Sequence, residues 1–476
     1  MMLPFLPEAA RRNFSQYSAL IGKDFSLSFE ELARSVRQFS LYLQESQPSS
    51  ERVLFEAHST AESVVLFWSI LNSGRLAVPL NYRLPDAALK ETLRLLNAAV
   101  YFGKLPRPLN ERIPLPKILT SRSGQGTSGT LRAAAEEFHP ATLVFTSGST
   151  ARPRAVVHSY GNHYFSALGA NRNMPLHIGD RWLLSLPLYH VAGIAILFRT
   201  MLAGAAVVLP DEHCSLKENI LQFKPTHLSL VATQLNDLLE DPSMNDALRA
   251  MKGILMGGSA IPENLLRKAH ERGWPLVLSY GSTQMSSQIT ATAPGDAFAA
   301  WQTSGRVLAY REVRIDDWGE IWVRGKTLFS GYWENGVTKK TTDENGWFAT
   351  GDLGRWDEKG RLIVLGRKDR MFISGGENIF PEEIERALER ISRVQRAVVV
   401  PVPESRFGQR PVAFVKAEKF DSVQEAAFKN ALRQILPGYK IPLRIFAWPD
   451  DVPSGMKVSL KWFENKARML LKEEDH

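Results

Sequence analysis

Apolar positions along the first hundred residues follow two different periods. From residue 29 to about residue 45 they recur every three or four positions, which predicts an amphipathic helix, and Ser28 and Glu31 have the spacing of a capping box at its start. Short apolar runs at residues 53–57 and 76–80 predict strands, and the apolar segment at residues 61–72 predicts a helix that ends at Gly74. The order strand, helix, strand predicts a βαβ unit with parallel strands.

Two changes of pattern divide the rest of the chain. Strands and helices alternate through residues 180–290, but residues 312–323 and 361–366 carry short strand-like runs with glycine turns. Beyond residue 370, Pro381 predicts a helix start, residues 397–402 and 412–416 predict strands, and Ser422 with Glu425 predicts a second capping box. Six apolar residues are expected on the buried faces of these two helices: Ile384, Leu388, Ile391, Phe428, Leu432 and Ile435.

We therefore expect an α/β protein with two domains. Residues 1–368 form a large N-terminal domain of mostly parallel sheets with flanking helices, including a β-rich part over about residues 305–368. Residues 369–476 form a small α+β C-terminal domain. In sheets of this kind, ligands bind on loops at the carboxyl ends of the strands.

Composition limits the function classes only loosely. The 476 residues include 58 Lys and Arg against 50 Asp and Glu, a net charge of +8 that suits nucleic acid, a membrane surface or small anions. These charges are scattered and form no basic block, so small anions are as good a reading as nucleic acid. The single cysteine, Cys214, excludes an internal disulfide and a cysteine-based zinc cluster. No apolar run reaches about 18 residues and no secretory signal pattern opens the chain, so we expect a cytoplasmic protein without membrane insertion.

The segment from residue 141 to residue 158 carries the strongest chemical signal. An apolar strand-like run leads into Thr, Ser and Gly, whose hydroxyl and backbone N–H groups are donors for an anion, and Arg152 and Arg154 add positive charge. The alternative is a polar surface turn. No Gly-Lys-[Ser/Thr] stands at the spacing of a Walker A loop.

Further segments combine glycine with polar residues directly after apolar runs. Each alone is weak, because Gly-Asp after a strand is usually a turn and a lone histidine is usually structural. They are residues 186–190 with Gly193, and residues 256–260, 279–284, 349–352, 366–369 and 374–378.

The order and spacing of these segments, over about residues 141–463, resemble the adenylate-forming superfamily of acyl-CoA synthetases, adenylation domains and luciferases. The resemblance implies that ATP is bound and that the small domain rotates about a hinge at Asp369. It assigns the phosphates to Thr146, Ser147, Gly148, Ser149, Thr150 and Arg154, the adenine side to Gly258, Ser259, Ala260, Tyr280 and Gly281, and the ribose to Asp352 and Arg367.

The resemblance also implies a catalytic lysine on the small domain. Lys457 is the match, although the usual Gly-Lys pair reads Met-Lys, and His190 and Thr283 join it as candidate catalytic residues. Such a lysine stabilises the charge that develops when an acyl carboxylate attacks the α-phosphorus of ATP. Taken alone, Lys457 would be a solvated surface lysine.

Within the superfamily, residues 157–160, 186–190, 282–288 and 455–459 resemble the 2-succinylbenzoate–CoA ligases of menaquinone biosynthesis. The resemblance implies CoA as co-substrate and an aromatic acid with two carboxylates, whose pocket needs polar donors beside an apolar wall. We expect Thr283, Ser286, Ser287 and Gln288 to supply donors and His190 to line the site. The alternative is that these serines merely end a strand.

Three departures from the superfamily pattern weaken the prediction. Gln284 stands where most relatives have a glutamate that helps to hold Mg²⁺, so we expect retained but weaker metal dependence, with Thr150 and phosphate oxygens as the other ligands. Ala151 replaces a glycine, and Arg154 replaces a lysine. Two rivals therefore stay open: a degenerate protein that binds an acyl adenylate without turnover, and a ligase for another aromatic or medium-chain acid. We expect small-molecule substrates, no nucleic acid, and leave a homo-oligomer open.

Overall fold

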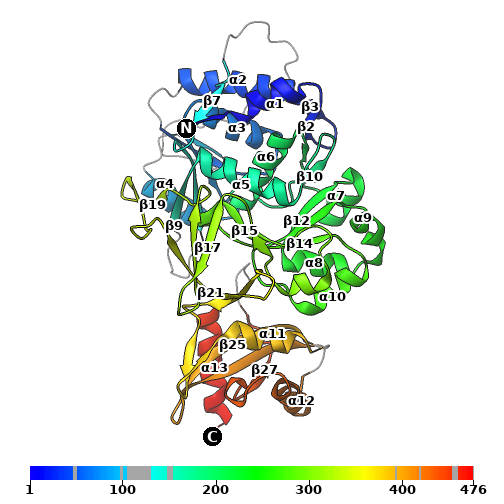
Figure 1. Ribbon diagram of the computed structural model, residues 1–476, viewed down its shortest axis with the longest axis vertical. Helices are drawn as coiled ribbons and strands as arrows, with labels where there is room; N and C mark the ends of the chain where they lie inside the picture. The colour runs from blue at the N-terminus through cyan, green and yellow to red at the C-terminus, as the bar shows by residue number, and fades with distance from the viewer. Residues whose placement is uncertain are drawn as a thin grey trace. The chain divides into compact units, whose positions relative to one another are not determined.

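The computed structural model describes residues 1–46, 51–96, 100–103, 130–146, 154–391, 394–417, 420–452 and 459–474. Two compact units account for the chain and are described separately (Figure 1). The first unit comprises Met1–Ser259, Arg272–Val313 and Val323–Phe348, and the second comprises Ala260–Glu271, Arg314–Trp322 and Ala349–His476. The predicted boundary between residues 368 and 369 stays a prediction.

A seven-stranded sheet of the first unit contains the predicted βαβ unit. Its order is β20-β19-β9-β8-β5-β4-β6, and β4 pairs in parallel with β5 and β6 while β8 and β9 pair antiparallel. Thr60 caps the crossover helix α3 (Ala61–Asn72) by accepting a hydrogen bond from Ser63 N. The strands are β4 (Arg52–Glu56), β5 (Leu76–Leu80), β6 (Val100–Phe102), β8 (Pro140–Thr146), β9 (Arg154–Ser159), β19 (Gly331–Glu334) and β20 (Val337–Lys339).

A nine-stranded sheet forms the other large layer of the first unit. Its order is β16-β15-β14-β13-β12-β10-β11-β2-β3, with parallel pairing from β2 to β14 and antiparallel pairing at both edges. The strands are β2 (Ser18–Ile21), β3 (Ser26–Ser28), β10 (Arg181–Leu183), β11 (Ala206–Val208), β12 (His227–Leu230), β13 (Gly253–Met256), β14 (Leu276–Ser282), β15 (Ser287–Ala291) and β16 (Arg306–Val307). The expected α/β class with mostly parallel sheets is confirmed.

The core of the first unit joins both sheets through the helices. Trp68 of α3 and Phe198 of α6 lie fully buried with ring centroids 4.9 Å apart, and burial of each such ring stabilises the fold by about 2–3 kcal/mol. The predicted capping box is present at the start of α2, where Glu31 N donates to Ser28 Oγ at 3.2 Å and Ser28 N donates to Glu31 Oε2 at 2.8 Å. The remaining helices are α1 (Leu6–Phe14), α2 (Phe29–Ser46), α4 (Asp86–Leu95), α5 (Tyr160–Asn173), α6 (Val191–Ala203), α7 (Leu216–Phe223), α8 (Ala232–Leu239) and α9 (Asn245–Arg249), and a small sheet pairs β1 (Met2–Pro4) with β7 (Ala134–Glu136).

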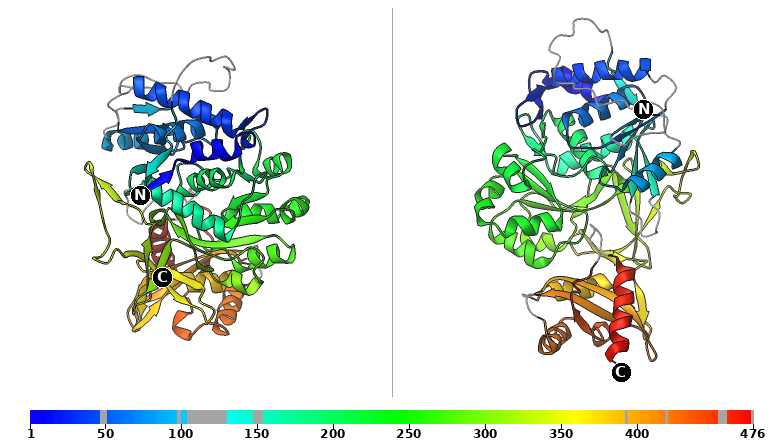
Figure 2. Two further views of the ribbon diagram at one scale, coloured as in Figure 1. Left: turned by 45° about the horizontal axis from the view of Figure 1, so that its top comes forward. Right: turned by 180° about the vertical axis from the view of Figure 1, so that it is seen from behind.

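The second unit is a small α+β fold. Its sheet β25-β26-β27 carries alternate apolar side chains on its two faces, one packed on α13 and the other on α11 and α12 (Figures 1 and 2). Val400 and Phe414 face α13, whereas Val399 and Val415 face the other helices. The elements are α10 (Glu263–Glu271), β21 (Phe348–Trp356), β22 (Leu362–Arg367), β23 (Phe372–Ser374), β24 (Glu377–Ile379), α11 (Pro381–Glu389), β25 (Val394–Glu404), β26 (Gly408–Ala417), α12 (Ser422–Arg433), β27 (Ile445–Ala447) and α13 (Leu460–Glu474).

Two details of the second unit differ from the sequence prediction. The predicted capping box at Ser422 and Glu425 is wrong, because Asp421 caps α12 by accepting from Gln424 N at 2.9 Å. Glu425 instead pairs with Lys429 and Arg444 at 2.8 and 3.1 Å. Ile435 lies beyond the end of α12 and is 53% exposed, so it does not join the buried face.

Over the described residues, no helix combines the length and the apolar character that crossing a membrane requires.

Candidate active site

The two ends of the predicted phosphate loop lie side by side in the first unit. Thr146 ends β8 and Arg154 begins β9, and the two residues are paired across this antiparallel hairpin. Thr146 Oγ1 donates to the carbonyl of Arg154 at 3.4 Å. The loop residues between them, among them Ser147, Gly148, Ser149 and Thr150, lie outside the described residues. The strand predicted to lead into the loop is confirmed as β8.

The segment after β14 lies beside this hairpin. The guanidinium of Arg154 lies 5.2 Å from the ring centroid of Tyr332, and Gln284 Nε2 donates to Tyr332 Oη at 2.9 Å. Gln284 belongs to the 3₁₀ turn η2 (Thr283–Met285), and Thr283 is its first residue. The structure therefore brings the predicted phosphate residue Arg154 and the predicted metal residue Gln284 to the same side chain, Tyr332, and the candidate catalytic residue Thr283 directly precedes Gln284.

Glycine is required at position 281 for a steric reason. A Cβ at Gly281 would overlap the carbonyl oxygen of Ser287, because β14 and β15 approach closely at this turn. Tyr280, the preceding residue, is half-buried on β14 and pairs with Thr290 of β15. Gly281 therefore allows β14 and β15 to approach closely at the turn between Tyr280 and Thr283.

The predicted adenine loop follows the neighbouring strand. Gly258 and Ser259 are exposed just after β13, and β13 pairs in parallel with β14, so this loop and Tyr280 follow the same edge of the sheet. Ala260 is exposed and is the first residue of the second unit. His190 is exposed at the start of α6, with its ring 4.6 Å from that of Tyr189.

Ser286 and Gln288 already have partners within the protein. Ser286 is fully buried, and its hydroxyl donates to the carbonyl of Thr327 at 3.0 Å. Gln288 is 5% exposed, and its Oε1 accepts from Arg199 at 3.2 Å. Ser287 is half-buried with a φ of 118°, a value that costs backbone strain in a residue other than glycine. Direct contact of these three residues with a substrate stays a prediction.

Two buried arginines that were not predicted from the sequence contact Gln288 of this segment. Arg199 of α6 is 2% exposed, and Arg311 of β17 (Arg311–Ile315) is 6% exposed. Arg311 Nε donates to the carbonyl of Gln288 at 2.6 Å, and Arg199 Nε donates to Asn171 Oδ1 at 3.2 Å. Within the described part of the chain, neither guanidinium pairs with a carboxylate, and Arg199 Nη2 is buried without a partner.

The electrostatics of this arginine pair favour an anion. Burial, and secondarily the positive charge of Arg311, lower the pKa of Arg199 to about 9. Burial likewise lowers the pKa of Arg311 to about 9. A buried charge without a counter-charge is costly, and a bound carboxylate would offset that cost. A sequence signal existed, because Arg199 is the one charged residue of the apolar helix VAGIAILFRTMLA.

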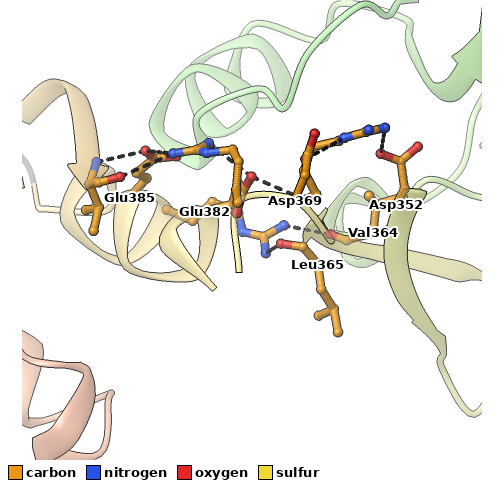
Figure 3. Close-up of polar contacts among 10 residues, drawn as sticks. Asp352, Val364, Leu365, Asp369, Glu382 and Glu385 are labelled. Carbon is orange, nitrogen blue, oxygen red and sulfur yellow. Dashed lines mark hydrogen bonds and ion pairs between the residues drawn. The ribbon is translucent and has the colours of Figure 1, made fainter. Parts of the chain in front are cut away.

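In the second unit, the predicted ribose and hinge residues form one cluster (Figure 3). Arg367 lies between two carboxylates, 3.0 Å from Asp352 and 3.2 Å from Asp369, and it also donates to the carbonyl of Thr350 at 3.1 Å. Burial alone lowers the pKa of Arg367, but the bonds to Asp369 and Asp352 outweigh it and raise the pKa overall. These contacts hold the guanidinium beside Asp352.

The residues after Asp369 belong to a second ion-pair group. Arg370 pairs with Glu382 at 3.0 Å and Glu385 at 2.7 Å, both on α11. Arg386 of α11 donates to the carbonyls of Val364 and Leu365 on β22, at 2.8 Å each (Figure 3). A rotation about Asp369 would keep the first contacts and break those of Arg386. The hinge stays a prediction, and Lys457 lies outside the described residues.

The fold, and the order of the site residues along the chain, indicate the class of this protein. A family model described as AMP-binding enzyme matches residues 6–333, and one described as AMP-binding enzyme C-terminal domain matches residues 383–454. The chain belongs to the family of AMP-binding enzymes. The predicted superfamily is confirmed.

Particular relatives narrow the resemblance. The chain is 33% identical over 445 residues to the 2-succinylbenzoate–CoA ligase of Escherichia coli strain K12, covering 93% of each chain. It is 30% identical over 472 residues to that of Bacillus pumilus, covering 96% of each. Among solved structures, it is similar to o-succinylbenzoate CoA synthetase (MenE) from Bacillus subtilis in complex with the acyl-adenylate intermediate OSB-AMP. That match has a TM-score of 0.85 and 28% identity, and it covers 98% of each chain. A complex of the same synthetase with ATP and magnesium ion gives a TM-score of 0.84 and 28% identity, covering 98% of this chain and all of that one.

Proposed function

We propose that this chain is an AMP-forming acid–thiol ligase that converts 2-succinylbenzoate, ATP and CoA to 2-succinylbenzoyl-CoA, AMP and pyrophosphate. One carboxylate oxygen attacks the α-phosphorus, the bond to the β-phosphate oxygen breaks, and pyrophosphate leaves. The sulfur of CoA then attacks the acyl carbon of the adenylate, AMP leaves, and the thiol proton passes to solvent. The curated relatives, which carry this activity in their names, support the assignment.

The observation that most favours a dicarboxylate substrate is the buried pair of Arg199 and Arg311. A dicarboxylate activated at one end brings its second carboxylate into the protein, and that charge needs a buried cation. Arg199 Nη2 is a buried donor without a partner in the described residues, next to Gln288 of the segment predicted to bind substrate. A fatty acid would leave this charge unpaired, whereas an aromatic dicarboxylate would neutralise it.

The remaining predicted site residues bind different parts of ATP. Thr146, Arg154 and the loop between them hold the phosphates, Thr283 lies beside them, and Asp352 with Arg367 hold the ribose hydroxyls. Tyr280 and the loop with Gly258, Ser259 and Ala260 border the adenine. Catalysis of this kind consists mainly of positioning and of positive charge, which Lys457 adds during adenylation.

Magnesium fits this site as an ion carried by ATP. No group of three or more His, Cys, Asp or Glu in the described residues is arranged as a metal site. Oxygen ligands suit Mg²⁺, and the phosphates supply them, with Gln284 Oε1 and the hydroxyl of Thr150 as the protein's contributors. When bound, the ion neutralises the charge of the departing pyrophosphate.

The variant Gln284→Glu is expected to lower the magnesium concentration that gives half-maximal activity by about threefold, since one added charge near a solvated ion contributes up to about 1 kcal/mol. Tyr332 Oη, now 2.9 Å from Gln284 Nε2, can donate to the new carboxylate, so the local contact survives. A magnesium titration of pyrophosphate exchange measures the shift, with Gln284→Met as the matched variant without an oxygen. Identical titrations of the wild type and both variants would show that this side chain is remote from the ion.

The experiment that tests the proposed function is ATP–pyrophosphate exchange with a panel of acids. Exchange is expected with 2-succinylbenzoate and weak or undetectable with benzoate and octanoate. Exchange driven by octanoate or benzoate alone would support the rival of a ligase for another acid. Binding of ATP without exchange for any acid would support the rival of a degenerate binding protein, to which Gln284, Ala151 and Arg154 point.

We also propose that the enzyme acts in the cytoplasm, where ATP and CoA are available. Self-association into a homo-oligomer is a separate proposal, and sedimentation of the purified chain tests it.

A further inference from the structure

Four polar residues of the first unit form a continuous buried chain of hydrogen bonds. Thr142 of β8, His158 of β9 and His163 of α5 are each 1% exposed or less. Thr142 Oγ1 lies 2.7 Å from His163 Nε2 and 3.1 Å from His158 Nδ1. His158 Nε2 lies 2.7 Å from the carbonyl oxygen of Thr283, the first residue of η2. Of these four residues, only Thr283 was among the site residues predicted from the sequence.

Both histidines are neutral at pH 7. Burial lowers the pKa of His158 to about 4, against the raising effect of its bond to Thr283. Burial, reinforced by His158, lowers the pKa of His163 well below its usual value. Each ring therefore carries one N–H, and the partners decide which nitrogen holds it.

The carbonyl of Thr283 sets the direction of the whole chain. A carbonyl oxygen only accepts, so His158 Nε2 must carry the hydrogen and His158 Nδ1 is an acceptor. The hydroxyl of Thr142 then donates to His158 Nδ1, and its oxygen accepts from His163 Nε2. This leaves His163 Nδ1 as a lone-pair nitrogen, and that atom is buried without a partner among the described residues. All three bonds thus run in one direction, from His163 to Thr283.

The hydrogen bond from His158 to Thr283 constrains the turn η2, which contains Thr283 and Gln284. The carbonyl of Thr283 also accepts from Ser286 N at 3.1 Å, and Phe329 N donates to the carbonyl of Gln284 at 2.8 Å. Since the peptide unit is planar, fixing the Thr283 carbonyl also fixes the direction of the Gln284 N–H, while Tyr332 Oη holds the Gln284 side chain. His158 lies four residues after Arg154, so the same strand borders the predicted phosphate loop.

We propose that His158 is a positioning residue that holds the Thr283–Gln284 turn against the hairpin of β8 and β9, with its ring oriented by the hydroxyl of Thr142, which in turn accepts from His163. The proposal rests on the proposed function only in taking this turn to contact ATP and its metal ion. His158 touches neither the acid nor the reacting phosphorus, and it acts through the backbone of Thr283.

The tautomers are tested in the protein without any substrate. Long-range proton–nitrogen correlation spectra of protein labelled with ¹⁵N-histidine are expected to show both rings neutral and protonated at Nε2 at pH 7. Spectra of His158→Gln and His163→Gln assign the two signals. The near-isosteric Thr142→Val is expected to shift the Nδ1 resonance of His158, because that nitrogen loses its donor. A His158 ring protonated at Nδ1, or charged at pH 7, would overturn the proposal.

The positioning role is tested with a matched pair of variants. The amide nitrogen of glutamine reaches the place of Nε2 and can still donate to Thr283, whereas the shorter asparagine reaches only the place of Nδ1. Calorimetric binding of Mg-ATP, which needs no acid, is expected to weaken about tenfold in His158→Asn and less than threefold in His158→Gln, as for loss of one buried hydrogen bond. In exchange assays the KM for ATP should follow the same order, while the KM for the acid changes little.

Two outcomes separate this role from general stability and from the proposed function. Equal Mg-ATP affinities in both variants and wild type, or equal losses in both, would contradict positioning through Nε2. If His158→Asn fails to fold, the comparison of His158→Gln with Thr142→Val decides. Only Thr142→Val keeps the imidazole ring of His158 while removing the hydroxyl that orients it. An ATP affinity that is unchanged in Thr142→Val would contradict the proposal. A protein that binds ATP in this order but exchanges with no acid would contradict the proposed function alone.

Discussion

Replacing Lys457 with alanine is expected to lower the rate of adenylate formation by about 10²- to 10³-fold, the loss typical of removing one preorganised charge-stabilising donor. The carboxylate attack places added charge on the oxygens of the α-phosphate, and Lys457 supplies a compact positive charge at that moment. The second half-reaction uses a thiol and an already formed adenylate, so it does not need this lysine. Thioester formation from supplied adenylate should therefore stay largely intact.

The two half-reactions are measured separately, the first as ATP–pyrophosphate exchange and the second as consumption of synthetic acyl adenylate by CoA. Lys461→Ala is the matched control, because Lys461 is an exposed lysine of α13 four residues further along the chain. Equal loss of both half-reactions in Lys457→Ala would show that the lysine assignment is wrong.

Replacing Arg199 with methionine is expected to lower kcat/KM for 2-succinylbenzoate by about 30- to 3,000-fold, which corresponds to the roughly 2–5 kcal/mol typical of losing one partner of a buried charge pair. We expect the side-chain carboxylate to be the one that is activated and the ring carboxylate to be the one that pairs with Arg199. Benzoylpropionate keeps the first and lacks the second, so it has no charge for Arg199 to pair with. Its low activity in the wild type should change little in the variant. Kinetics with the two acids, in wild type and variant, give the comparison.

Stability distinguishes this role from a structural one. Methionine matches the volume of the arginine stem and removes a buried charge that has no carboxylate partner in the described residues, which offsets the loss of the hydrogen bonds to Asn171 and Gln288, so the melting temperature of Arg199→Met should change little. Arg172→Met, which removes an exposed arginine of α5, is the control and should leave both acids unaffected. A variant that loses activity equally with both acids, or that loses it through unfolding, would contradict carboxylate recognition by Arg199.

Local patterns were predictable from the sequence because their causes lie within a few residues. The period of apolar positions and the Ser28–Glu31 capping box predicted α2, and the alternation of apolar runs predicted the parallel pair β4 and β5. The second capping box failed by one residue, because Asp421 and Ser422 are both good caps and only the geometry of the turn selects between them.

The missed parts of the site depend on contacts between distant residues. His158 and Thr283 are 125 positions apart, and Arg199 and Gln288 are 89 positions apart. No period or spacing predicts such a contact. The sequence did predict that residues 283–288 matter, but it treated their side chains as free donors. The fold instead gives Ser286 and Gln288 partners and adds Arg199 Nη2, a buried donor with no hydrogen-bond partner among the described residues.

Product analysis of the complete reaction is the decisive test of the proposed ligase activity. The purified chain is incubated with ATP, Mg²⁺, CoA and 2-succinylbenzoate, and the nucleotides and thioesters are quantified by mass spectrometry. We predict AMP and 2-succinylbenzoyl-CoA in equal amounts, with neither formed when the acid is left out. Formation of ADP in place of AMP, or AMP without the thioester while octanoyl-CoA or benzoyl-CoA forms readily from its acid, would contradict it.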